Sequence, residues 1–161
     1  MVIYPYGLKI DGDSLWVGWV EDEFGDQDVL ELNSEGHLKY SLTVEEFLDG
    51  HDRSLIEIRQ HDGEILDLDK VNEWLTTREE MNPQLILDAW NFFGDLARSV
   101  GKEIETRSAY EMDVYEKLFL SLNLLTTDGP LYEPDWSETQ LDCIADVIRN
   151  GQSLLSEALE R

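Results

Sequence analysis

The densest group of residues able to do chemistry is an acidic run in the amino-terminal half, EDEFGDQD at positions 21–28. Its carboxylates do not follow the alternate-residue pattern of a helix-loop-helix calcium site, and no glutamate closes the run at the required position. Carboxylates also meet lysine and arginine side chains of other proteins. A solvated loop is one interpretation, and a docking surface for a basic partner is the other. The candidate contacts are Glu21, Asp22, Glu23, Asp26 and Asp28.

Two tryptophans stand directly before this run. Trp16 and Trp19 differ by three positions in the segment LWVGWV, so in a β-strand they project from opposite faces. Either the strand is buried on both faces in a curled, barrel-like sheet, or one tryptophan lies exposed beside the carboxylates. In the second case Trp16 or Trp19 is the apolar contact of a protein interface, where tryptophan is a common hot spot.

The residue types that usually carry catalysis are sparse. His37, His51 and His61 all fall beside expected turns, and none has a second histidine or a cysteine at metal-ligand spacing. We interpret Cys143 as a half-buried helical thiol rather than a nucleophile. The chain contains no G-x-S-x-G elbow, phosphate-cradling glycine loop or dinucleotide fingerprint. The sequence therefore predicts no catalytic residue, metal site or cofactor.

Net charge is the strongest compositional signal. The chain has 161 residues, and its 36 acidic against 12 basic side chains give a formal charge of −24. Residues 1–80 hold 21 acids and 6 bases, and residues 81–161 hold 15 and 6, so the excess is general. Such a field repels nucleic acid and anionic membranes, and it attracts basic proteins. The alternative is that acidity serves only solubility.

Length and hydropathy bound the organisation of the chain. With 42% apolar residues, positions 1–161 fit a single domain with a sizeable core. We find no apolar run of ~18 residues and no basic-then-apolar signal peptide in MVIYPYGLKI. The single cysteine excludes an intramolecular disulfide. We therefore expect a cytoplasmic protein.

Alternating patterns and turn residues predict an antiparallel β-meander of five to six strands over residues 1–68. Residues 4–10 and 15–20 form the first expected hairpin. Residues 28–33 and 37–42 form the second, which pairs Leu32 with Leu38 and Leu30 with Tyr40. A third hairpin is expected to pair Ile58 with Leu66 and Ile56 with Leu68, because this register keeps apolar residues on one face.

Helical periodicity dominates residues 69–161. The clearest helix begins at Asn82, a good N-cap, continues with Pro83 at the first helical position and ends at Gly101. Short helices are expected at 43–50, with Thr43 and Glu46 as a capping box, and at 69–77. Longer ones are expected at 108–125, buried on more than one side, and from Ser137 onward. Strands first and helices afterwards are typical of an α+β domain, here a meander packed against three longer helices.

These observations favour a binding protein over an enzyme. Our leading hypothesis is an acidic, non-enzymatic inhibitor that neutralises a basic protein, since the chain is similar in size and charge to small immunity proteins for bacterial toxin nucleases. One alternative is a small enzyme with a carboxylate or divalent-metal site. Another is a self-associating structural protein with its acids at the rim of the contact. The sequence leaves the oligomeric state and the partner open.

Overall fold

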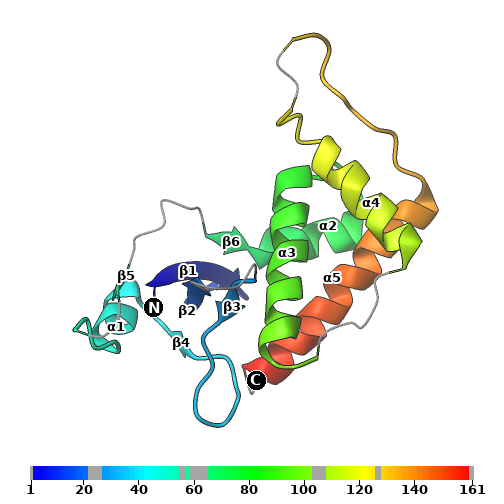
Figure 1. The fold of residues 1–161 in the computed structure, drawn as a ribbon. Helices are drawn as coiled ribbons and strands as arrows, with labels where there is room; N and C mark the ends of the chain where they lie inside the picture. Colours follow the sequence, from blue (N-terminus) through cyan, green and yellow to red (C-terminus); the bar gives the residue numbers. More distant parts are fainter. Residues whose placement is uncertain are drawn as a thin grey trace.

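The computed structural model describes residues 2–21, 27–54, 57–58, 65–102, 108–125 and 128–159, and it has the expected α+β architecture (Figure 1). Six strands form one sheet, and the longer helices follow it in the chain. The strands are β1 (Val2–Ile10), β2 (Asp13–Glu21), β3 (Val29–Leu30), β4 (Tyr40–Ser41), β5 (Glu57–Ile58) and β6 (Leu66–Asp67). The helices are α1 (Val44–Asp49), α2 (Leu68–Thr77), α3 (Pro83–Ser99), α4 (Ala109–Leu120) and α5 (Glu138–Ala158).

The β1–β2 hairpin is the centre of the sheet. It pairs Tyr4 with Trp19 and Leu8 with Leu15, as the predicted first hairpin requires. The turn is only Asp11-Gly12, with φ angles of 51° and 81°, the two-residue geometry that matches the twist of paired strands. Asp69 at the start of α2 accepts both turn N–H groups, at 2.7 and 2.9 Å. The turn is thereby fixed to the helical half of the chain.

The outer strands depart from the predicted meander. Leu32 bridges Leu38 as expected, but Leu30 lies opposite Trp19 and Tyr40 opposite Val17. The expected Leu30–Tyr40 pair is therefore wrong, because β3 and β4 follow one another along the same edge of β2.

The prediction of a third hairpin is also wrong. Ile58 pairs in parallel with Ile3, and Leu66 pairs in parallel with Leu8, so β5 and β6 both lie along the other edge of β1. Leu68, the expected partner of Ile56, is the first residue of α2, while Ile56 and the expected turn at residues 61–63 lie outside the described residues. The sheet is mixed rather than purely antiparallel.

Helix α3 is the main packing element between the sheet and the other helices (Figure 1). Its start is the predicted one: Asn82 caps it by accepting the Leu85 N–H at 3.1 Å, and Pro83 follows. Trp90 is only 1% exposed at its middle. Helix α5 begins after Ser137, as predicted, with Ser137 and Gln140 as a capping box, and it runs through Gly151 without a break. A Cβ at Gly151 would lie 2.2 Å from Phe93 Cγ, so the missing side chain lets α3 and α5 approach closely.

Helix α4 corrects a further expectation. It ends at Leu120 rather than near Leu125, and only Val114 and Leu118 are buried along it. Met112 and Leu120 are exposed, so the expected burial on more than one side is wrong. Leu120 and Leu124, which add a second apolar side to the expected helix at 108–125, are left at the surface.

Candidate protein-binding groove

Two adjoining hollows, of about 960 and 550 Å³, run along the open side of α3. They share Trp19, Asn91 and Asp95, and we call them together the α3 groove. The larger hollow lies between α3, α4, α5 and the residues before β3, and the smaller lies between α3, the sheet and the start of α2. The groove thus brings together residues from both halves of the chain.

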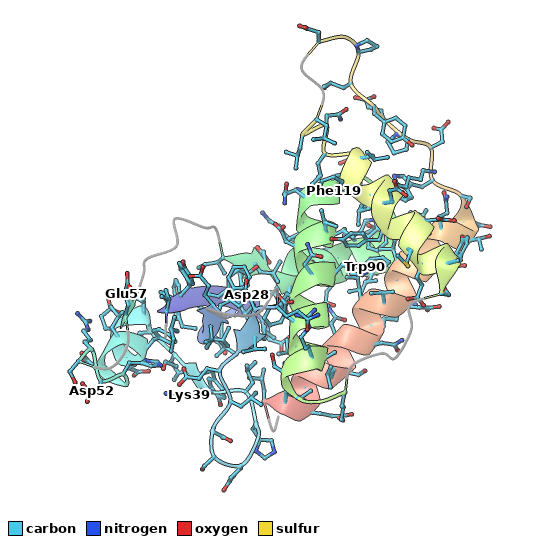
Figure 2. All side chains as sticks on the ribbon, in the orientation of Figure 1. Asp28, Lys39, Asp52, Glu57, Trp90 and Phe119 are labelled. Atoms are coloured by element: carbon cyan, nitrogen blue, oxygen red, sulfur yellow. The ribbon has the colours of Figure 1, made fainter. Side chains whose placement is uncertain are left out.

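Aromatic rings line much of this groove. Tyr6 stacks on Phe92 with ring centroids 5.9 Å apart, and Trp19 meets Tyr6 edge-on at 6.1 Å. In the larger hollow, Trp90 meets Tyr115 edge-on at 5.6 Å, and the Tyr115 hydroxyl donates to Asn91 Oδ1 at 2.9 Å. Figure 2 shows Trp90 within the helical half, where α3, α4 and α5 meet. Trp90 is only 1% exposed, but Tyr6, Trp19 and Tyr115 are half-buried and offer apolar walls that also favour a cation over their faces.

The charged lining of the groove is mainly acidic. Among the described residues it has six carboxylates, those of Asp28, Asp67, Asp88, Asp95, Glu111 and Glu157, against three bases, Lys70, Arg98 and Lys102. Arg98 donates to Asp95 Oδ1 at 2.9 Å and to the Asp28 carbonyl at 3.1 Å, and Lys102 pairs with Glu157. Two of the three bases are therefore already engaged with the groove's own acceptors.

Tyr6 responds to this environment. Burial, reinforced by the charges of Asp88 and Asp95, raises the pKa of Tyr6 to about 12. Loss of the phenolic proton would place a third negative charge beside two carboxylates, so the neutral hydroxyl is favoured. The groove accordingly disfavours added negative charge.

The structure brings together two of the predicted contact residues. Asp28 and Trp19 both line the larger hollow, and Figure 2 shows Asp28 beside α3 on the sheet side. Glu21 lies at the exposed end of β2, where it accepts the Tyr4 hydroxyl at 3.1 Å. Asp22, Glu23 and Asp26 lie outside the described residues.

The two tryptophans do project from opposite faces, as predicted. Trp19 faces α3 and contacts Tyr4 and Tyr6, whereas Trp16 pairs with Gly7 on the other side. The Trp16 ring lies 3.3 Å from where a Gly7 Cβ would be, so it covers that glycine. Both tryptophans are half-buried, and only Trp19 lines the groove.

A polar cluster on the Trp16 face was not predicted. His51 has a side chain only 2% exposed, and its Nε2 lies 2.7 Å from Glu31 Oε2. Its Nδ1 lies 2.6 Å from the Phe47 carbonyl, and Lys39 Nζ donates to Glu31 Oε1 at 2.7 Å. Lys39 Nζ also lies 3.4 Å from His51 Nε2, so the three side chains form one polar cluster. No spacing in the sequence signals this cluster, because its members come from three separate segments.

Cys143 is half-buried on α5, as predicted. Burial, with the charges of Glu111 and Asp146, raises the pKa of this thiol, which disfavours the reactive thiolate. Across the described ranges, no three histidine, cysteine or acidic residues are placed to share a metal ion. Nor does any helix in the described part of the chain have the length and apolar content needed to cross a membrane.

Comparison with protein-family models, curated proteins and solved structures gave no match to this chain. The α3 groove and the charge of the chain are therefore the basis for a functional proposal.

Proposed function

We propose that this is a cytoplasmic, non-enzymatic binding protein that neutralises a basic protein, and that the α3 groove receives lysine or arginine side chains of that partner. The observation that carries the proposal is the combination of aromatic walls with six carboxylates in one open groove. A lysine or arginine side chain has an apolar stem and a cationic head. Rings suit the stem and carboxylates suit the head, so the lining complements both parts.

The net charge of −24 supports a basic partner over any other class. A surplus of this size speeds the approach of a cationic protein and slows that of an anionic one. Toxin nucleases are a chemically suitable partner, because a cleft that holds a phosphate backbone must itself be cationic. An immunity protein for a bacterial toxin nuclease would occlude such a cleft by presenting carboxylates in place of phosphates.

The test compares two variants with the same net charge. The groove variant carries Asp28→Asn, Asp88→Asn and Glu111→Gln, which lie in the two hollows. The control carries Asp49→Asn, Glu73→Gln and Asp113→Asn, which are exposed and outside the groove. A partner captured from native lysate at ~50 mM salt is identified by mass spectrometry, purified, and tested for binding kinetics against both variants.

We expect a basic partner whose association rate falls about tenfold with the groove variant and less than about twofold with the control. Binding to the wild-type protein should weaken steeply between ~50 and ~500 mM salt, because exposed charges are screened over that range. A neutral or acidic partner, or affinity indifferent to salt, would contradict the proposed function. If both variants associated equally slowly, the groove would not be the binding site, because charge anywhere on the surface would have the same effect.

A further inference from the structure

The described parts of the connection between α4 and α5 project beyond the helices at the top of the molecule (Figure 1). We call this connection the α4–α5 loop, and the structure describes it at 121–125 and 128–137. Five large apolar residues are exposed here. One is the last residue of α4, Leu120 (44%), and four are on the loop: Leu124 (67%), Leu125 (77%), Leu131 (66%) and Tyr132 (45%). They are half of the ten exposed large apolar residues in the described part of the chain. Exposed leucines are ordinary singly, but a cluster marks a contact site.

The two arms of this loop are tied together. Asn123, in the left-handed region at φ 56°, accepts the Tyr132 N–H at 2.7 Å and donates to the Tyr132 carbonyl at 3.1 Å. The same amide donates to the Ser121 carbonyl at 3.0 Å. One side chain thus takes the place of a pair of backbone hydrogen bonds across the loop. Leu124 and Leu131 are the chain neighbours of Asn123 and Tyr132, so these hydrogen bonds bring the two leucines toward one another.

A second tie holds the base of the loop. Lys117 Nζ lies 4.8 Å from the centroid of the Trp136 ring, donates to the Asp135 carbonyl, and donates to Gln140 Oε1 at 2.9 Å. Because both ends are fixed in the free protein, less conformational entropy is lost when the loop binds. The two ties thus hold together the two arms of the loop that carry Leu124, Leu125 and Leu131.

The charge around the loop selects the kind of partner. Residues 117–148 contain six acidic side chains and one base, Lys117, which is already engaged by the Asp135 carbonyl and by Gln140 at the base of the loop. Six acids against one base leave this stretch with a net charge of −5, which disfavours contact with an anionic membrane or with a second copy of this chain. The same charge favours a protein whose own apolar pocket is bordered by lysines and arginines.

We infer that the α4–α5 loop is a second contact element, which inserts Leu124, Leu125 and Leu131 into an apolar pocket bordered by basic residues on the partner. The inference rests on the proposed function, since it concerns the same basic protein. The groove supplies charge contacts that set the rate of association. The loop supplies a desolvated apolar contact that sets the rate of dissociation.

The first experiment locates the contact. The photo-crosslinking residue p-benzoylphenylalanine replaces Leu125 in the full chain, or replaces Glu45 on α1 as an exposed control at the other end of the molecule (Figure 1). Both proteins are irradiated in native cells and the products identified by mass spectrometry. We expect position 125 to crosslink a basic protein more strongly than position 45 does. No excess over position 45, or crosslinking to a second copy of this chain, would overturn the inference.

The second experiment measures kinetics with the crosslinked protein after purification. Leu124→Ser with Leu125→Ser should speed dissociation at least about tenfold and leave association within about twofold. Leu124→Met with Leu125→Met keeps the apolar area and should restore slow dissociation. All variants should unfold at the wild-type temperature, because Leu124 and Leu125 are exposed in the free protein.

The two proposals fail in different ways. If the serine variant dissociates as the wild type does while the groove variant associates slowly, the inference about the loop is wrong and the proposed function stands. If the partner is acidic, or its binding is indifferent to salt, the proposed function fails and the inference that rests on it fails too.

Discussion

The β1–β2 hairpin has two faces that are covered in different ways. On the face toward α3, Leu8, Leu15 and Val17 are all 0% exposed and belong to the main core. On the opposite face, Gly7 and Gly18 lie beneath side chains: the Trp16 ring covers Gly7, and Glu31 covers Gly18. A Cβ at Gly18 would lie 2.8 Å from Glu31 Oε2. The α3 face is wholly apolar at its centre, whereas the opposite face combines buried apolar residues, such as Ile3, with a polar cluster that lies over Gly18.

The two faces also differ in whether they lead to the proposed binding site. The apolar face continues into the α3 groove through Tyr6 and Trp19, which lie at its open edge. The Glu31–His51–Lys39 cluster, in contrast, has its charges satisfied within the chain and holds α1 against the sheet. We therefore expect substitutions on the two faces to be distinguishable by what they remove.

The largest expected effect is the loss of stability caused by a cavity on the α3 face. Val17→Ala removes two methyl groups from a fully buried site and should lower the free energy of unfolding by about 2–3 kcal/mol. Val20→Ala is the matched control, because Val20 is on the same strand but half-buried on the opposite face. It should cost less than about 1 kcal/mol, measured by urea unfolding. Equal losses would mean that the two faces do not differ in packing.

The second effect is an energetic coupling between Glu31 and His51 on the opposite face, measured in the free energy of unfolding. Glu31→Gln and His51→Gln should each cost about 1–2 kcal/mol, and the double variant should cost less than the sum by about 1 kcal/mol. The reason is that either substitution alone leaves the other side chain, which is at most 20% exposed, without its polar partner at 2.7 Å.

The control for this coupling is the Asp146–Arg149 pair on α5. Its atoms lie 3.8 Å apart and its side chains are 73% and 54% exposed, so its coupling should stay below about 0.5 kcal/mol. A Glu31–His51 coupling no larger than that of the control pair would show that the cluster does not stabilise the face.

Local signals explain why the helices and the first hairpin were predictable. Asn82, Ser108 and Ser137 each accept an N–H of the first helical turn, and each is visible in the sequence as a cap before a periodic stretch. The β5 and β6 pairings were not predictable. Each strand is two residues long, and its position is set by contact with β1 rather than by the turn between them.

The same distinction applies to the site. Strand periodicity alone placed Trp16 and Trp19 on opposite faces, and the acidic run pointed to Asp28. The rest of the groove could not be predicted, because Tyr6 and Asp95 meet only after α3 packs on the sheet. Likewise, the spacing of Leu120, Leu124 and Leu125 placed them on the buried faces of the expected helix at 108–125. Their exposure depends on where α4 ends, which is set by the left-handed Asn123 and its bonds to Tyr132.

The smallest expected effect concerns Tyr6, the ionisable group on the apolar face. Its pKa of about 12 in the folded protein exceeds the usual value of 10.0, so the unfolded state loses the proton first. The wild type should keep this stabilisation below pH ~10 and lose about 1 kcal/mol of it by pH ~11. Tyr6→Phe has no phenolic proton and should fall less steeply over that interval, measured by urea unfolding at each pH. The five other tyrosines are common to both proteins, so they cancel in the difference. Parallel pH profiles would show that Tyr6 titrates as freely as an exposed tyrosine, and the open edge of the groove would then be better solvated than the stacked Tyr6–Phe92 geometry indicates.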